Sequence, residues 1–121
     1  MYAHPMLFRI DPSGTEPLAA QLASQIRSAA ARGELTPGTR LPSARDVADS
    51  LGVNLHTVLR AYQDVRDEGL IDLRRGRGAV MTSAARDVRR LREAIDHAVA
   101  IAHDLGVSPT TTLSLVKEAL Q

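Results

Sequence analysis

Short polar and basic side chains gather at the start of one predicted helix. Asn54, His56, Thr57 and Arg60 fall within its first two turns, and Leu55 lies between them. Amide, imidazole, hydroxyl and guanidinium groups hydrogen-bond phosphate oxygens and base edges, and an apolar side chain can contact the methyl group of thymine. These residue types at this spacing indicate recognition of double-stranded DNA. A structural role stays open for some of them: Asn54 can act only as a helix cap, and His56 and Thr57 only as surface residues.

A second basic cluster follows closely in the sequence. Arg75, Gly76 and Arg77 lie between two short β-like runs, Leu70–Leu73 and Ala79–Thr82. Glycine lets a turn come close to DNA, and an arginine at such a turn suits the narrow minor groove. The pattern predicts a hairpin that grips DNA, which we call the wing. An ordinary charged hairpin tip is the alternative.

Arg45 occupies an unusual place for a basic residue. Ser43 can cap the helix that contains Arg45, and Asp46 stands where a capping box has its acid. The first turn of a helix favours negative charge because of the helix dipole. A cation there favours contact with phosphate or a base over the alternative, an ordinary solvated arginine. The predicted DNA-binding residues are therefore Ser43, Arg45, Asn54, Leu55, His56, Thr57, Arg60, Arg75, Gly76 and Arg77.

The elements that must hold these side chains can be predicted from periodicity and turn residues. Pro42–Gly69 indicates two amphipathic helices joined by a tight turn at Leu51–Val53, which is typical of a helix-turn-helix. An earlier helix is predicted over Glu16–Arg32, with Pro17 at its first helical position. A short extended segment across Leu7, Arg9 and Asp11 is a weaker prediction. The fold class is mainly α with a small β-hairpin, a winged helix-turn-helix.

The last part of the chain has an apolar stripe that needs a partner. After Ser83 the apolar residues recur at alternating spacings of three and four, as in paired helices. We predict a DNA-binding domain over residues 1–82 and a short two-helix dimerisation region over 83–121. The predicted dimerisation residues are Val88, Leu91, Ile95, Ala98, Ala102, Leu105, Leu113 and Val116.

Composition excludes several function classes. The chain of 121 residues has no cysteine, a net charge of +1 and only three aromatic residues. It therefore has neither a disulfide framework nor a set of rings on which single-stranded nucleic acid could stack. His97 and His103 are six residues apart, on different faces of one helix, so neither a metal site nor a cofactor is predicted. Catalytic motifs are lacking, which disfavours an enzyme.

The sequence also lacks signals for membranes and export. It has neither a long apolar run that would span a membrane nor a basic patch and apolar core at its N-terminus. The expected location is the cytoplasm, without a membrane partner.

From about Glu16 to Met81 the chain resembles the DNA-binding domain of the GntR family of bacterial repressors. The shared residues include Pro17-Leu18, Pro37-Gly38, Leu41-Pro42-Ser43, Arg45, Leu51-Gly52-Val53, Thr57-Val58, Glu68-Gly69-Leu70 and the two glycines Gly76 and Gly78. Only about forty residues follow this segment, which is similar to the small YtrA-like subfamily with two C-terminal helices.

The resemblance implies a winged-helix homodimer, commonly a repressor, that binds an operator with inverted half-sites. It implies DNA contacts at Arg45, Asn54, His56, Thr57 and the Arg75-Gly76 pair. The chain departs from the pattern at Leu55 and Leu59, where many relatives carry other residues, arginine in the case of Leu55.

Two questions stay open at this point. A winged helix can also bind proteins, so a protein-interaction adaptor is the second hypothesis. The sequence does not tell whether a small-molecule effector controls the protein, and an effector would have to bind at the dimer interface or between the two regions.

Overall fold

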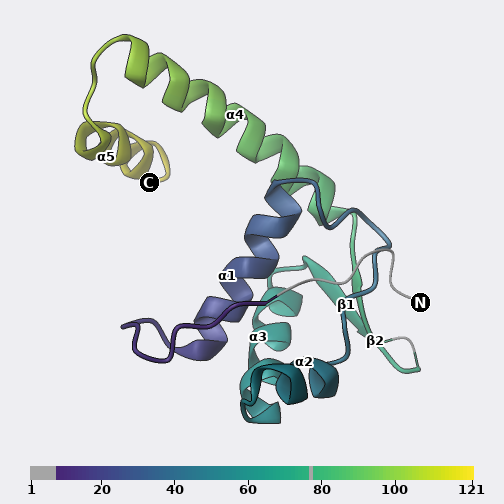
Figure 1. The fold of residues 1–121 in the computed structure, drawn as a ribbon. Coiled ribbons are helices and arrows are strands. Elements are labelled where there is room, and N and C mark those ends of the chain that lie inside the picture. Colours follow the sequence, from purple (N-terminus) through teal and green to yellow (C-terminus); the bar gives the residue numbers. More distant parts are fainter. Residues whose placement is uncertain (1–7, 77) are drawn as a thin grey trace. The chain divides into compact units, whose positions relative to one another are not determined.

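The computed structural model describes residues 8–76 and 78–121, which contain five helices and a two-stranded sheet (Figure 1). The elements are α1 Leu18–Ala31, α2 Ala44–Leu51, α3 Leu55–Asp67, β1 Ile71–Arg74, β2 Gly78–Met81, α4 Ala84–Asp104 and α5 Pro109–Ala119. One compact unit ends at Arg89, and a second covers Arg90–Gln121. The mainly helical fold with one β-hairpin confirms the predicted fold class.

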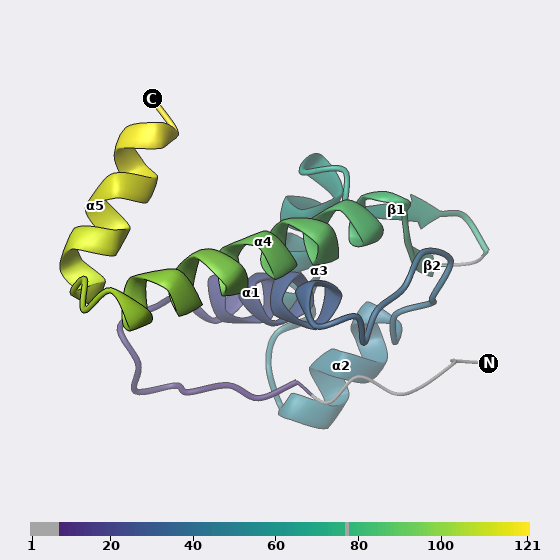
Figure 2. The same cartoon turned by 90° about the horizontal axis from the view of Figure 1, so that it is seen from above.

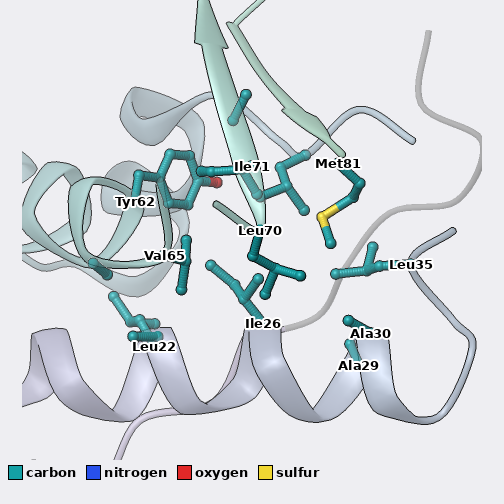
Figure 3. Close-up of a cluster of buried hydrophobic side chains, with 14 of the residues drawn as sticks. Leu22, Ile26, Ala29, Ala30, Leu35, Tyr62, Val65, Leu70, Ile71 and Met81 are labelled. Carbon is teal, nitrogen blue, oxygen red and sulfur yellow. The ribbon is translucent and has the colours of Figure 1, made fainter. Parts of the chain in front are cut away.

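Helices α1 and α3 pack on each other to form the centre of the first unit (Figures 1 and 2). The three-to-four spacing of apolar residues on α1 turns Leu22 and Ile26 toward α3 and the sheet. Tyr62 and Val65 meet them from α3 (Figure 3). All four side chains are buried, so the core fixes the angle at which α3 is presented.

Helix α1 begins one residue later than predicted. Pro17 is the N-cap residue, with an extended ψ of 148°, and its carbonyl accepts the first helical hydrogen bond from Gln21 N at 3.0 Å. The carbonyl of Glu16 instead accepts a hydrogen bond from the side chain of Gln21. Pro17 is therefore the cap of α1 rather than its first helical residue, the position that the prediction gave it.

The helix-turn-helix follows the predicted capping residues. Ser43 Oγ accepts a hydrogen bond from Asp46 N at 3.1 Å, and Asn54 Oδ1 accepts one from His56 N at 2.8 Å. Between the two helices, Gly52 has a φ of 68°, a left-handed conformation that glycine adopts at no steric cost. Each of these residues confirms its predicted role in starting or stopping a helix.

The wing has a third extended segment that the sequence did not reveal. Strands β1 and β2 pair antiparallel, with Ile71 opposite Met81 and Arg74 opposite Gly78. On the other side of β2, Arg40 forms an isolated bridge with Val80. The backbone that precedes α2 is thereby joined to the hairpin.

The segment before α1 is held by side chains rather than by a sheet. No strand forms over residues 8–14, Asp11 begins a turn, and Leu7, the first residue of the predicted extended segment, lies outside the described residues. The backbone amides of Arg9 and Asp11 donate to Gln25 and Gln21 of α1 instead, each at 2.8 Å. Polar side chains of α1 thus satisfy the backbone groups that a strand partner would have paired.

The second unit lacks a core of its own. None of its residues is buried, and Leu91, Leu105 and Leu113 are 62%, 73% and 57% exposed. Ser108 Oγ caps α5 by accepting a hydrogen bond from Thr111 N at 3.1 Å, and Pro109 occupies the first helical position. The helices of the described residues are each too short or too polar to span a lipid bilayer.

Candidate nucleic-acid interface

The polar side chains at the start of α3 are presented to solvent. Asn54, His56 and Arg60 are exposed and Thr57 is half-buried, whereas Val58 on the opposite face is completely buried. A recognition helix needs this division, because one face must anchor it while the first turns meet base edges. Tyr62 strengthens the anchor by donating a hydrogen bond from its hydroxyl to the carbonyl of Pro42 at 2.5 Å.

The Asn54 side chain caps α3 through its oxygen and also carries an NH2 group that can donate hydrogen bonds. Its Oδ1 is used by the His56 amide, as described above, and its Nδ2 group is a donor that a cap of this geometry does not need. The two interpretations of Asn54, helix cap and DNA contact, are therefore compatible in one side chain.

Leu55 differs from its polar neighbours. It is half-buried and packs against the core cluster, so only part of its side chain is available for a thymine methyl group. The half-buried Leu59 continues the same helix. Packing against the core accounts for the apolar residue at Leu55, one of the two positions where the sequence departs from the family pattern.

The start of α2 presents both of its predicted contact residues. Ser43 and Arg45 are exposed, and the Ser43 hydroxyl accepts a hydrogen bond from the Asp46 amide. A hydroxyl and a guanidinium two positions apart at a helix N-terminus suit a phosphate group.

The wing tip is exposed and open. Arg75 and Gly76 form the described part of the turn, with Gly76 at a φ of 80°. A Cβ atom added at Gly76 would have no heavy atom within 4 Å, so the space around the turn is free for a ligand's approach. Arg77, the third predicted residue of the wing, lies outside the described residues.

Two further arginines border the wing, and the sequence analysis did not select them. Arg40 and Arg74 line a recess of 310 Å³ together with Gly38, Gly76 and Val80. Arg40 lies in a turn segment without periodicity, so no local pattern marked it. Only its bridge to Val80 reveals that it belongs to the wing.

An ion pair far from these groups fixes the other end of α3. Arg27 of α1 donates from Nε to Glu68 Oε1 at 2.8 Å and from Nη2 to Oε2. The hydrogen bond from Arg27 lowers the pKa of the Glu68 carboxyl and raises that of the guanidinium. Because both side chains are 43% exposed, the pair contributes modestly to stability.

The comparisons with known proteins agree with this geometry. The family model described as bacterial regulatory proteins, gntR family, matches residues 18–81, more than half of the chain. The chain belongs to the GntR family.

Full-length relatives place this GntR protein near the YtrA type. It is 29% identical over 118 residues to the transcriptional repressor YtrA of Bacillus subtilis, covering 93% of this chain and 91% of that protein. It is 31% identical over 105 residues to the regulator Rv1152 of Mycobacterium tuberculosis, covering 87% of each. The predicted resemblance to the YtrA-like subfamily is confirmed.

Solved structures support the same assignment. YtrA of Sulfolobus acidocaldarius, a GntR-family transcription factor, matches with 41% identity and a TM-score of 0.60, covering 78% of this chain and 99% of that one. The DNA-binding domain of AraR, solved in complex with operator ORX1, shares the fold with a TM-score of 0.56 at 23% identity, covering 65% of this chain and 99% of that one.

The GntR assignment makes the chain a transcriptional regulator with a DNA-binding domain rather than an enzyme. Among the described residues, no three His, Asp or Glu side chains come together in a way that could hold a metal ion. The exposed side chains described above lie within residues 18–81, the segment that the family model matches.

Proposed function

We propose that this GntR protein is a repressor that binds, as a homodimer, an operator made of two inverted half-sites. The observation that carries the proposal is that one compact unit presents both the exposed polar start of α3 and an exposed basic wing. An α-helix fits the major groove of B-DNA, and a glycine-containing turn with arginine suits the minor groove.

In this proposal the contacts divide into two kinds. Asn54, His56 and Thr57, together with Arg60 and the exposed part of Leu55, face base edges from α3. The remaining predicted residues hold the sugar-phosphate backbone from α2 and the wing, namely Ser43, Arg45, Arg75, Gly76 and Arg77. Backbone contacts position the protein, and contacts to base edges give sequence specificity.

The exposed apolar residues of the second unit support a homodimer. Ile95 and Val116 are 45% and 46% exposed, and Leu91, Leu105 and Leu113 are more exposed still. Ala98 is exposed too, and Ala102 is half-buried. Monomeric proteins rarely expose so continuous an apolar surface. A second copy of the same unit offers an equally long apolar face, so a symmetric pair covers both.

The proposed domains, residues 1–82 and 83–121, meet inside the first compact unit. Ala85 is buried in the core cluster and Val88 packs against it, so the first turns of α4 belong structurally to the winged helix. We therefore propose that α4 joins DNA binding to dimerisation in one continuous helix. Since the bacterial chromosome lies in the cytoplasm, the proposal includes a cytoplasmic location.

The start of α4 also offers a place for a small-molecule effector. A recess of 370 Å³ is lined by apolar groups of Ala30, Leu35 and Ala85 and by Arg86 and Arg89, among others. Apolar walls with a few polar groups are typical of small-molecule sites. We propose this recess as the effector site, and a metabolite that raises the melting temperature of the wild type should do so less for Arg86→Ala.

Selection of bound sequences from a random duplex pool tests the main proposal. A homodimeric repressor should enrich a palindromic consensus whose half-sites are about one helical turn apart or a multiple of this. Its affinity should fall steeply as salt rises, because phosphate contacts release counterions. The alternative, a protein-interaction adaptor, predicts little affinity for duplex DNA at any salt concentration.

A further inference from the structure

The recess beside the wing brings together two arginines that are distant in sequence. Its lining includes Arg40, from the segment before α2, and Arg74, the last residue of β1. Backbone pairing sets their positions, because Arg40 bridges Val80 while Arg74 is paired with Gly78. Both residues therefore flank β2, one on each side of it.

The recess is open where a ligand would enter. Gly38 and Gly76 border it, and a Cβ added at either would have no heavy atom within 4 Å. Arg74 Nη2 lies 3.3 Å from Asp72 Oδ2, and both side chains are more than half exposed. Exposed pairs of this kind are weak, so the guanidinium can exchange Asp72 for a doubly hydrogen-bonded phosphate at little cost.

The position of the recess points to DNA rather than to a metabolite. Gly76 belongs both to the recess and to the wing tip, and Arg40 precedes Ser43 and Arg45 by only a few residues. The recess thus lies on the path between the two backbone-contacting parts of the proposed interface. Among the described residues of its lining, Val80 is the one apolar side chain, whereas sites for small molecules are mostly apolar.

We infer that Arg40 and Arg74 together bind one phosphodiester group of the DNA backbone at the base of the wing. The inference rests on the proposed function and extends it. The contact joins the wing to α2, and it carries no sequence information because every nucleotide has the same phosphate. Its loss should weaken specific and non-specific duplexes by the same factor.

Fluorescence anisotropy with a labelled operator duplex and an unrelated duplex, across a salt series, tests the inference. Arg40→Ala and Arg74→Ala should each weaken both duplexes about tenfold, as expected for a charged hydrogen bond. The double variant should reduce the slope of log affinity against log salt by about one. Arg40→Lys should recover part of the loss, because a lysine retains the charge.

Arg66→Ala is the matched control, because Arg66 is an exposed arginine in the last turn of α3 and its removal changes net charge equally. Unchanged melting temperatures would show that the variants fold. If Arg40→Ala and Arg74→Ala bind DNA as tightly as Arg66→Ala does, while the wild type binds the operator, the inference is overturned and the proposed function still stands. A wild type without duplex affinity would overturn both.

A separate titration with inorganic phosphate, without DNA, distinguishes the two sources of the phosphate group. The inference expects no saturable binding of free phosphate at millimolar concentration. Saturable binding that Arg40→Ala abolishes would assign the recess to a small anion and overturn the assignment to DNA.

Discussion

The two compact units differ in whether their apolar side chains are buried. In the first, eighteen hydrophobic residues from six of the elements and the loops between them are buried in one cluster. In the second, beyond Arg89, leucine, isoleucine and valine side chains stay exposed on both helices. In the first unit the apolar faces of the helices pack on one another and on the sheet, whereas the helices beyond Arg89 leave their apolar side chains exposed. Secondary structure is therefore separable from tertiary packing within this one chain.

Truncation of a core residue should give the largest effect and affect the first unit alone. Ile26→Ala removes a completely buried side chain from α1 and should lower the free energy of unfolding by about 2–5 kcal/mol. Chemical denaturation followed by circular dichroism measures the change. The same truncation at Leu120, which is 80% exposed and lies outside the proposed dimer seam, is the control, and equal losses at both positions would contradict the contrast between the units.

A charge in the exposed apolar stripe should break the assembly and spare the fold. Ile95→Asp places a carboxylate where the proposed dimer buries an apolar side chain, which is costly. We expect a monomer in sedimentation and a loss of operator affinity of at least tenfold, while the first unit retains its helical signal. Glu93→Asp leaves the stripe unchanged and serves as the control. A dimer in the Ile95→Asp variant would place the seam elsewhere.

Removal of a contact residue should separate binding from folding. Arg45→Ala should weaken operator binding by about 1.5–3 kcal/mol, as expected for a charged hydrogen bond to phosphate, and leave the melting temperature nearly unchanged, because the exposed side chain contributes little to the core. Anisotropy and thermal unfolding measure the two quantities side by side. A parallel loss of both would give Arg45 a structural role instead.

The smallest effect concerns the Arg27–Glu68 pair. The Glu68 pKa is lowered in the folded protein, so the stabilisation is present above the carboxyl's unfolded pKa and is lost as pH falls through the folded one. Since the pair is exposed, Glu68→Gln should cost less than about 1 kcal/mol at pH 7. The difference from wild type should vanish in acid. A difference that persists at pH 2 would exclude the ion pair as its cause.

Short sequence patterns predicted most of the first unit, because the ends of its helices depend on residues that are close together in the sequence. Ser43, Gly52 and Asn54 each act within three residues of their own position, so the sequence alone marks them. Arg40 acts through a bridge to Val80, which no short pattern encodes. Contacts between segments that are distant in the sequence depend on how the whole core packs, so residue spacing does not predict them.

The candidate site shows the same limit. Periodicity separated the exposed His56 from the buried Val58, because helical spacing assigns them to different faces. It did not tell whether Leu55 packs against the core or lies on the surface, because a residue at the edge of the apolar face can do either. The exposure of such an edge position depends on neighbouring elements.

Helix α4 runs without interruption from Ala84, beside the buried Ala85, to Asp104 among exposed residues. An α-helix turns by about 100° for each residue. Within the second unit, Leu91, Ile95, Ala98 and Ala102 recur at spacings of four and three and so share one face of this helix. Insertion or deletion of a single residue between Leu91 and Ala102 would rotate the later ones off that face, so changes of length in this segment are tolerated only in whole turns.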